Sequence, residues 1–466
     1  MQVKQLILAV AATLAAGSVL AAPVTPAQIG SARAAGTLQE TWISGASAPT
    51  FNIFRGFELG CDANSVALFS NSSSDSNVRP GSLGNYAAYA CTRGGVVSVV
   101  YHTVFDGSLN AYAPHVSGTQ LQRLRRLDQA NCQVATGAFP GHVNYKSCTL
   151  VNPVATPDGA INKPAGGFSD VEASLFGLDV SSAGTEAEAY VGQTFGVAVS
   201  LPLYRALQAA QGLTANDLPA NAPNISSAQY TSIIAASSGY QTDWSPLLGD
   251  AGAGKAIYLE RRVASSGTQA SSNAHFLKSP CTDGVLAGLA PAGAADSVPG
   301  SFVVTEHSGS GNVKGALTTR GTNGQFAIGV LSLENNWRTD SEANQGYRYV
   351  KLDGVHPEAG TFDGNSNGTA DGIEFARETA INGDYGFHVE MRSFVANTAD
   401  AFGAQLIPEI TSALGNPVNC SDVPRGLTLN PLGGSICSSA ATPGELQVTA
   451  KGTRFGNNCA PQQLFF

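Results

Sequence analysis

The chain has 466 residues, of which 43% are hydrophobic and 13% are charged, and it carries a formal net charge of −9. The hydrophobic content excludes an intrinsically disordered chain, and the negative charge argues against nucleic acid or an anionic membrane as a partner. A chain of this length exceeds one compact core, so we expect at least two lobes.

The N-terminus has the pattern of a secretory signal peptide. Lys4 precedes an apolar run over 6–16, and small residues surround Ala21, which predicts a signal peptide over 1–21. No later apolar run approaches the roughly 20 residues that a membrane-spanning helix requires. We therefore expect an exported protein without membrane insertion, either periplasmic or secreted.

The cysteines predict disulfide bonds. There are eight of them, and an even number in an exported chain is typical of a disulfide framework. None forms a Cys-x-x-Cys pair, and none has a histidine at the spacing of zinc ligands. We predict the local disulfides Cys61–Cys91 and Cys132–Cys148, with the cysteines at 281, 420, 437 and 459 paired among themselves.

Segments typical of strands and helices alternate along the chain, which favours an α/β architecture. In such folds, ligands bind at the carboxyl ends of the strands. The expected elements, in chain order, are a helix after the turn at 44–49, a strand at 96–104, a strand at 195–201 with a helix at 203–211, a strand at 257–259 with a helix at 269–276, and a strand at 326–333.

The turn over 262–268, Arg-Val-Ala-Ser-Ser-Gly-Thr, predicts an oxyanion site. It lies between a strand-like run and a helix-like run, so the first free N–H groups of the helix would point at a bound anion. Arg262 would add a guanidinium, and Ser266 and Thr268 would add hydroxyls. The alternative is an ordinary surface loop, since short hydroxyl-rich motifs are common.

Six segments in this order resemble the type II periplasmic binding proteins, specifically the phosphate-binding proteins of ABC transporters and their secreted relatives. The segments are the turn at 44–49, Gly-Phe-Ser-Asp at 167–170, the run at 225–230 with Asp-Trp-Ser at 243–245, the turn at 262–268, Ala-Ile-Gly-Val at 327–330, and 350–355 with 383–387. Together they span most of the mature chain.

The resemblance implies an α/β two-lobed type II periplasmic-binding-protein clamp with disulfide-stapled insertions. The first lobe would comprise 38–195, with an insertion at about 109–165, and 345–466 as its return. The second lobe would comprise 196–344. The residues that it implies at the anion are Ser47, the Ala48 amide, Ser108, Asp170, Arg262, Ser266, Gly267 and Thr268.

Asp170 would set the preference between anions. A carboxylate can accept a hydrogen bond from a protonated ligand oxygen but repels a fully deprotonated anion, so it favours phosphate over sulfate. The alternative role of Asp170 is a helix N-cap before 171–173. Two positions depart from the family pattern, because Ala264 stands where the family has an aspartate and Ser265 where it has a glycine. Ala264 removes the carboxylate that would orient Arg262, so we expect phosphate or a related oxyanion as the ligand, with phosphate favoured by Asp170.

A second motif predicts a structural Ca²⁺ ion. The loop 363–374, Asp-Gly-Asn-Ser-Asn-Gly-Thr-Ala-Asp-Gly-Ile-Glu, has oxygen ligands at positions 1, 3, 5, 9 and 12 and glycine at position 6, as a calcium loop requires. An Asn-Gly-rich turn without a metal is the alternative. The predicted metal ligands are Asp363, Asn365, Asn367, Thr369, Asp371 and Glu374.

The sequence favours a binding protein over an enzyme. It contains no His-Glu-x-x-His, the motif of zinc proteases. No Gly-x-Ser-x-Gly segment marks a hydrolase nucleophile, since the match at 364–368 lies within the predicted calcium loop. We expect a monomeric solute-binding protein for a small oxyanion, with an ABC permease as its partner. The alternatives are a surface-interaction or adhesion module on the same fold and a secreted phosphatase.

Overall fold

The computed structural model describes residues 22–73, 84–105, 107–116, 126–136, 142–151, 164–235, 243–282, 289–290, 302–338, 346–358, 377–415, 423–433 and 448–465. The predicted signal peptide and the predicted calcium loop lie outside these ranges. Within them, no helix is both long and apolar enough to span a membrane.

Helices and strands alternate through most of the chain. The helices are α1 (Pro26–Ala34), α2 (Thr50–Leu59), α3 (Leu201–Ala210), α4 (Ser227–Ile234), α5 (Ser245–Leu248), α6 (Gly267–Ser272), α7 (Ser310–Thr322), α8 (Glu378–Ile381) and α9 (Ala401–Leu414). The strands are β1 (Gln39–Gly45), β2 (Ala67–Ser70), β3 (Tyr86–Arg93), β4 (Val96–Thr103), β5 (Arg126–Asp128), β6 (Gln133–Val134), β7 (Val143–Lys146), β8 (Thr149–Val151), β9 (Gly166–Ser169), β10 (Gly184–Ser200), β11 (Asn224–Ile225), β12 (Ile257–Arg262), β13 (Phe302–His307), β14 (Phe326–Ser332), β15 (Tyr347–Tyr349), β16 (Lys351–Leu352), β17 (His388–Ala396), β18 (Leu427–Leu429), β19 (Gly452–Thr453) and β20 (Gln463–Leu464).

The elements predicted from apolar runs are present. The strand expected at 96–104 is β4, the strand expected at 326–333 is β14, and the helix expected at 203–211 is α3. The strand expected at 195–201 is the end of a longer one, because β10 already begins at Gly184. The helix expected at 269–276 is α6, which begins at Gly267 and continues as a π-helix over Asn273–Leu277.

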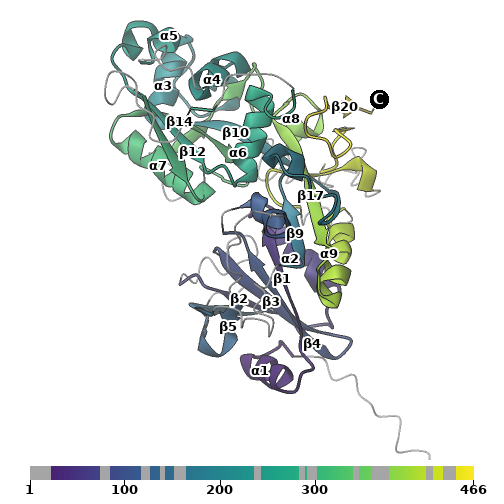
Figure 1. Cartoon of the computed structure of the whole chain (residues 1–466). Coiled ribbons are helices and arrows are strands. Elements are labelled where there is room, and N and C mark those ends of the chain that lie inside the picture. The colour runs from purple at the N-terminus through teal and green to yellow at the C-terminus, as the bar shows by residue number, and fades with distance from the viewer. Residues whose placement is uncertain are drawn as a thin grey trace, which may run out of the picture.

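The protein has two lobes that share the long strand β10 (Figure 1). The first part of β10 pairs with β17 and β18, and its last residues pair with β14 and β15. The strands of both lobes therefore form one continuous 14-stranded sheet. Its order is β13-β12-β14-β10-β17-β9-β1-β4-β3-β2-β7-β6, and β15 and β18 also pair with β10. This is the α/β two-lobed architecture that the sequence predicts.

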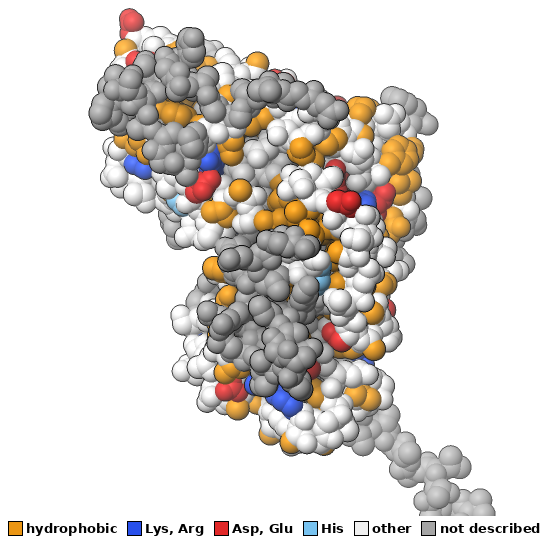
Figure 2. All heavy atoms as spheres, in the orientation of Figure 1, with side chains coloured by type: hydrophobic (Ala, Val, Ile, Leu, Met, Phe, Trp, Pro, Cys, Tyr) orange, Lys and Arg blue, Asp and Glu red, His pale blue; other side chains and the backbone are white. Residues whose placement is uncertain are grey.

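Each lobe has its own hydrophobic core. In the first lobe, α2 and α9 cover the sheet, and buried side chains such as Phe54, Phe57 and Ile407 fill the space between them. In the second lobe, side chains of α3, α4 and α6 pack on β10, β12 and β14 around Phe195 and Leu259. On the face in Figure 2, charged side chains are sparse and hydrophobic side chains gather where the lobes meet.

Three disulfides lie among the described residues. Cys61–Cys91 and Cys132–Cys148 confirm the predicted local pairs, and Cys281–Cys459 joins two of the last four cysteines. Cys420 and Cys437 lie outside the described residues. The Cys132–Cys148 bridge belongs to the predicted insertion, where β7 pairs with β2 and extends the outer edge of the first lobe's sheet.

The return to the first lobe lies later in the chain than residue 345. β15 still pairs with the second-lobe part of β10, and β16 pairs with β11. The side chains of Tyr347 and Tyr349 pack with Val313 and Leu317 of α7. The chain rejoins the sheet of the first lobe at β17, which pairs with β9 and β10.

Candidate functional site

Three neighbouring parallel strands of the first lobe end at the same edge. β1 pairs in parallel with both β4 and β9, so the segments that follow them lie side by side. Ser47 follows β1, Ser108 lies beyond β4, and Asp170 directly follows β9. The Ser44 hydroxyl donates to the Asn110 carbonyl at 2.7 Å and ties two of these strand ends together. In α/β sheets this edge is where ligands bind.

The second lobe has a matching edge. β12 pairs in parallel with β13 and β14, and Arg262 is the last residue of β12. Ser308 and Ser310 come after β13, and Glu334 comes after β14. Each lobe thus presents the carboxyl ends of three parallel strands.

The two edges meet at the predicted oxyanion turn. The Leu109 amide donates to the Ser265 carbonyl at 3.0 Å across the two lobes. A Cβ atom at Gly267 would overlap the Asp170 Oδ2 and Ser108 Oγ atoms. Gly267 therefore allows the second lobe to lie directly against Asp170, which any larger residue at that position would prevent.

Asp170 is buried at the centre of this contact, with 5% of its surface exposed. The Ser108 hydroxyl donates to its Oδ2 at 3.0 Å. Its other oxygen, Oδ1, is buried and has no hydrogen-bond partner among the described residues. Burial raises the pKa of Asp170 to about 6, although the Ser108 hydrogen bond and the charge of Arg262 act in the opposite direction.

Asp170 is not the helix cap that the sequence also allowed. The short 3-10 helix that follows runs from Ala173 to Phe176, and its N-cap residue is Glu172, without a side-chain hydrogen bond. The carboxylate of Asp170 instead faces Ser108 of the first lobe and Arg262 of the second.

The Arg262 guanidinium is held by the segment after β13. Its Nη1 donates to the Ser310 hydroxyl at 2.9 Å, and its Nη2 donates to the Ser308 carbonyl at 2.9 Å. In the sequence, 308–311 is only a short Ser-Gly-Ser-Gly run, whereas the structure uses this segment to orient the arginine. The hydroxyl and the carbonyl fix the orientation of the guanidinium, which also interacts electrostatically with Asp170 and Glu334.

The turn after Arg262 presents free backbone donors. The Ser266 amide donates to the Val263 carbonyl, and the Gln269 and Ala270 amides donate to the Ser266 carbonyl. Among the described residues, the amides of Gly267 and Thr268 have no acceptor. A cavity of about 10 Å³ lies beside Arg262 and Thr268, which is room for about one water molecule.

Glu334 is a further charged residue at the site, which the sequence reasoning missed. It interacts electrostatically with Asp170, Arg262 and Lys314, and the Ser332 hydroxyl donates to its Oε1 at 3.1 Å. Burial raises its pKa to about 7, and the charge of Asp170 adds to this shift. The signal was present in the sequence, because Glu334 directly follows the strand predicted at 326–333.

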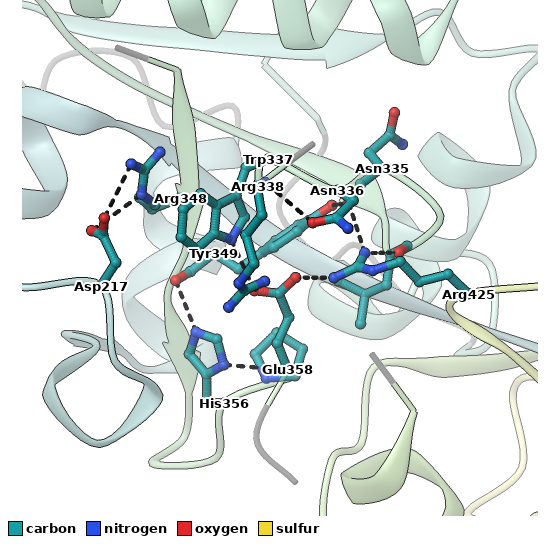
Figure 3. Close-up of polar contacts among 12 residues, drawn as sticks. Asp217, Asn335, Asn336, Trp337, Arg338, Arg348, Tyr349, His356, Glu358 and Arg425 are labelled. Carbon is teal, nitrogen blue, oxygen red and sulfur yellow. Dashed lines mark hydrogen bonds and ion pairs between the residues drawn. The ribbon is translucent and has the colours of Figure 1, made fainter. Parts of the chain in front are cut away.

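A buried ion cluster holds the turn that carries Glu334 (Figure 3). Arg425 donates to the carbonyls of Leu333 and Asn335, the residues on either side of Glu334. Arg425 also pairs with Glu358, whose exposed fraction is 1%. Because Arg425 stands just before β18 of the first lobe, the cluster fastens the turn at the junction of the lobes.

The charge of Glu358 is stabilised by several donors at once. Its Oε2 accepts from Trp337 Nε1 at 3.0 Å and from Arg338 Nη1 at 2.9 Å. Burial alone would raise the pKa of Glu358, but Arg425 and Arg338 outweigh it and lower that pKa to about 2. Trp337 also lies beneath two guanidinium groups, with Arg348 at 3.9 Å and Arg338 at 4.2 Å from its ring centre.

The predicted site residues are only partly brought into contact. Ser108, Asp170, Arg262 and the 266–268 turn meet at the lobe junction, as described above. Ser47 and Ala48 lie at the same sheet edge, but among the described residues no hydrogen bond links either to Asp170. Ser47 is exposed, and its carbonyl accepts the Thr50 amide and hydroxyl at the start of α2. The six predicted calcium ligands lie outside the described residues.

No protein-family model matches the chain, and no curated protein matches it significantly. In structure it is similar to a proposed phosphate ABC transporter substrate-binding protein with bound phosphate from Clostridium perfringens, at 13% identity over 83% of this chain and 96% of that chain, with a TM-score of 0.38. It is also similar to a possible phosphate binding protein from Planctomyces limnophilus, at 12% identity over 82% and 89% of the two chains, with a TM-score of 0.31.

An ABC-type phosphate transport receptor from Vibrio cholerae matches at 16% identity over 52% of this chain and 72% of that chain, with a TM-score of 0.28. All three bear names of the class that the sequence motifs resemble. At such identities and TM-scores, the likeness by itself identifies neither the ligand nor the partners of this chain.

Proposed function

We propose that this protein is an exported solute-binding protein that holds a small oxyanion, with phosphate favoured, between its two lobes. The observation that carries the proposal is Asp170, a buried carboxyl with one oxygen that has no partner among the described residues. It is enclosed by Ser108 of one lobe and the Arg262 and Gly267 segment of the other. Buried polar atoms in folded proteins nearly always have partners. In this proposal, a ligand bound between the lobes is the hydrogen-bond partner of the Asp170 Oδ1 atom.

The donors and acceptors around Asp170 suit a partly protonated anion. Arg262, the Gly267 and Thr268 amides, and the hydroxyls of Ser266 and Thr268 would donate to ionised ligand oxygens. Asp170 would accept from a ligand O–H group. Sulfate has no proton near neutral pH and would face the repulsion of a carboxylate, so phosphate is the better fit.

A binding role also suits the histidines. Burial, as the largest cause, lowers the pKa of His102, His275, His356 and His388, so these side chains are neutral near pH 7. His102, for example, shares a hydrogen bond of 2.8 Å with the buried Tyr89 hydroxyl. Their environments support packing and hydrogen bonding rather than proton transfer to a substrate.

The remaining parts of the proposal come from the sequence. The signal peptide over 1–21 would direct the chain to the periplasm or the exterior, and an ABC permease would receive the ligand there. The loop at 363–374 would bind a structural Ca²⁺ ion. The protein would act as a monomer.

Calorimetric titration with phosphate, sulfate and a phosphomonoester tests the proposal, after unfolding and refolding to remove carried ligand. We expect one phosphate per chain and weaker sulfate binding. Asp170→Asn should shift the preference towards sulfate, because it removes the carboxylate charge while it keeps an acceptor for Ser108. Binding of no oxyanion at millimolar concentration would contradict the proposal, and release of phosphate from the monoester would favour the phosphatase alternative.

A further inference from the structure

A buried glutamine lies where the cores of the two lobes meet. Gln193 is on β10, directly opposite Val389 of β17. Val191 belongs to the core of the first lobe and Phe195 to that of the second. Because side chains alternate along a strand, Gln193 points to the same face as Phe195. It is a buried polar residue on this face at the crossing between the lobes.

That face is the one that carries the proposed site. Phe168 of β9 is paired with Ser393 of β17, and alternation puts Ser393 on the same face of β17 as Val389. Phe168 and Gln193 therefore share a face, and Asp170 lies two residues beyond Phe168. Phe195 belongs to the same hydrophobic core as Val171 and Ala270, the residues just after Asp170 and just after the 266–269 segment.

The Gln193 amide has no hydrogen-bond partner in the part of the chain that the structure describes. Only 1% of the residue is exposed, and both Nε2 and Oε1 are buried without a hydrogen-bond partner among the described residues. A buried amide without partners is costly, and an apolar side chain would avoid that cost. Gln208 shows the usual solution, because its Nε2 donates to the Asn216 and Asn221 carbonyls and its Oε1 accepts from Arg205.

We propose that Gln193 is a ligand-contacting and specificity-determining residue of the same oxyanion site, an inference that rests on the proposed function. Its Nε2 donates to an ionised oxygen of the ligand, and its Oε1 accepts from a protonated one. An amide supplies both roles without adding charge beside Asp170 and Glu334. The ligand class is therefore an anion that carries O–H and O⁻ groups together, such as monohydrogen phosphate.

Two substitutions test this role by calorimetry at pH 7 with inorganic phosphate as the probe. Gln193→Met keeps the shape and removes both polar atoms, and we expect it to weaken phosphate binding at least tenfold. We expect the melting temperature of the ligand-free protein to stay equal or to rise, because an unpartnered amide has been removed. Gln193→Glu, with nearly the same shape as glutamine, should weaken phosphate binding further through charge repulsion. If Gln193→Met does not fold, Gln193→Glu is the variant that tests the role.

Gln208→Met is the matched control. It removes an amide whose partners are all protein groups, so it should lower the melting temperature and leave phosphate affinity unchanged. If wild-type protein binds phosphate and Gln193→Met binds it within twofold of wild type, buried water is the partner of the amide and this inference is wrong. If wild-type protein binds no oxyanion, the proposed function fails, and this inference fails with it.

Discussion

Asp170→Asn should make the ligand-free protein more stable at neutral pH. The pKa of Asp170 is raised from its ordinary value of 3.8 to about 6, chiefly by burial. The folded state therefore binds this proton more tightly than the unfolded state does. The cost of the ionised carboxylate is absent below about pH 4, grows as the pH rises through the folded pKa, and is constant above it.

The size of the stability difference follows from the pKa shift of Asp170. Each pKa unit corresponds to about 1.4 kcal/mol, so two units imply a cost of roughly 3 kcal/mol above pH 6. Asparagine is neutral at every pH and can still accept from Ser108. The unfolding free energy of Asp170→Asn should therefore exceed that of wild type by up to about 3 kcal/mol at pH 7.5 and match it near pH 4.

Denaturant unfolding of ligand-free protein between pH 4 and pH 8 measures this difference. Asp243→Asn is the control with the opposite sign, because hydrogen bonds from Ser245 and Gly254 lower the pKa of Asp243. That variant should lose stability at neutral pH relative to acid pH. This prediction is wrong if Asp170→Asn is less stable than wild type at pH 7.5, or if the difference in unfolding free energy does not depend on pH. Asp170 would then stabilise the fold instead of destabilising the ligand-free protein.

Arg262→Ala and Thr268→Val should each weaken phosphate binding about ten- to a hundredfold in calorimetry, since a charge-assisted contact is worth about 1.5–3 kcal/mol; unchanged affinity in both would remove the turn from the site. If the loop at 363–374 binds Ca²⁺, a chelator should lower the melting temperature of wild type but not of Asp363→Ala, and equal melting curves for wild type with and without chelator would exclude the ion. Glu358→Gln should lower the unfolding free energy by about 3–5 kcal/mol, because it leaves the charge of Arg425 uncompensated; a loss below 1 kcal/mol in denaturant unfolding would contradict this.

The sequence predicts the strand ends of the site because apolar runs are followed by short polar turns. The turn at 262–268 stands out for this reason, whereas Asp170 was implied by the resemblance to phosphate-binding proteins, and both lie at the lobe junction. The same rule applied to the strand at 326–333 would have found Glu334. The first half of β10 was missed because polar and apolar residues alternate there, over 184–190, instead of forming an apolar run.

Other features depend on contacts between residues that are far apart in the sequence. Arg425 reaches the turn at 333–335, about ninety positions away, and no local pattern connects the two. The partners of Arg262, Ser308 and Ser310, appear in the sequence only as a turn rich in serine and glycine. The burial of Gln193 without a hydrogen-bond partner among the described residues could not be predicted from local sequence. It depends on the register in which β9, β10 and β17 pair, because the register decides on which face of the sheet the side chain lies.

Anomalous diffraction from crystals grown with arsenate tests the central claim most directly, because arsenate has the charge and shape of phosphate and arsenic scatters anomalously. The claim predicts one strong arsenic peak between the lobes, within hydrogen-bond reach of Asp170 and the Gly267 and Thr268 amides. No peak at this junction, or a peak only elsewhere on the molecule, would contradict it.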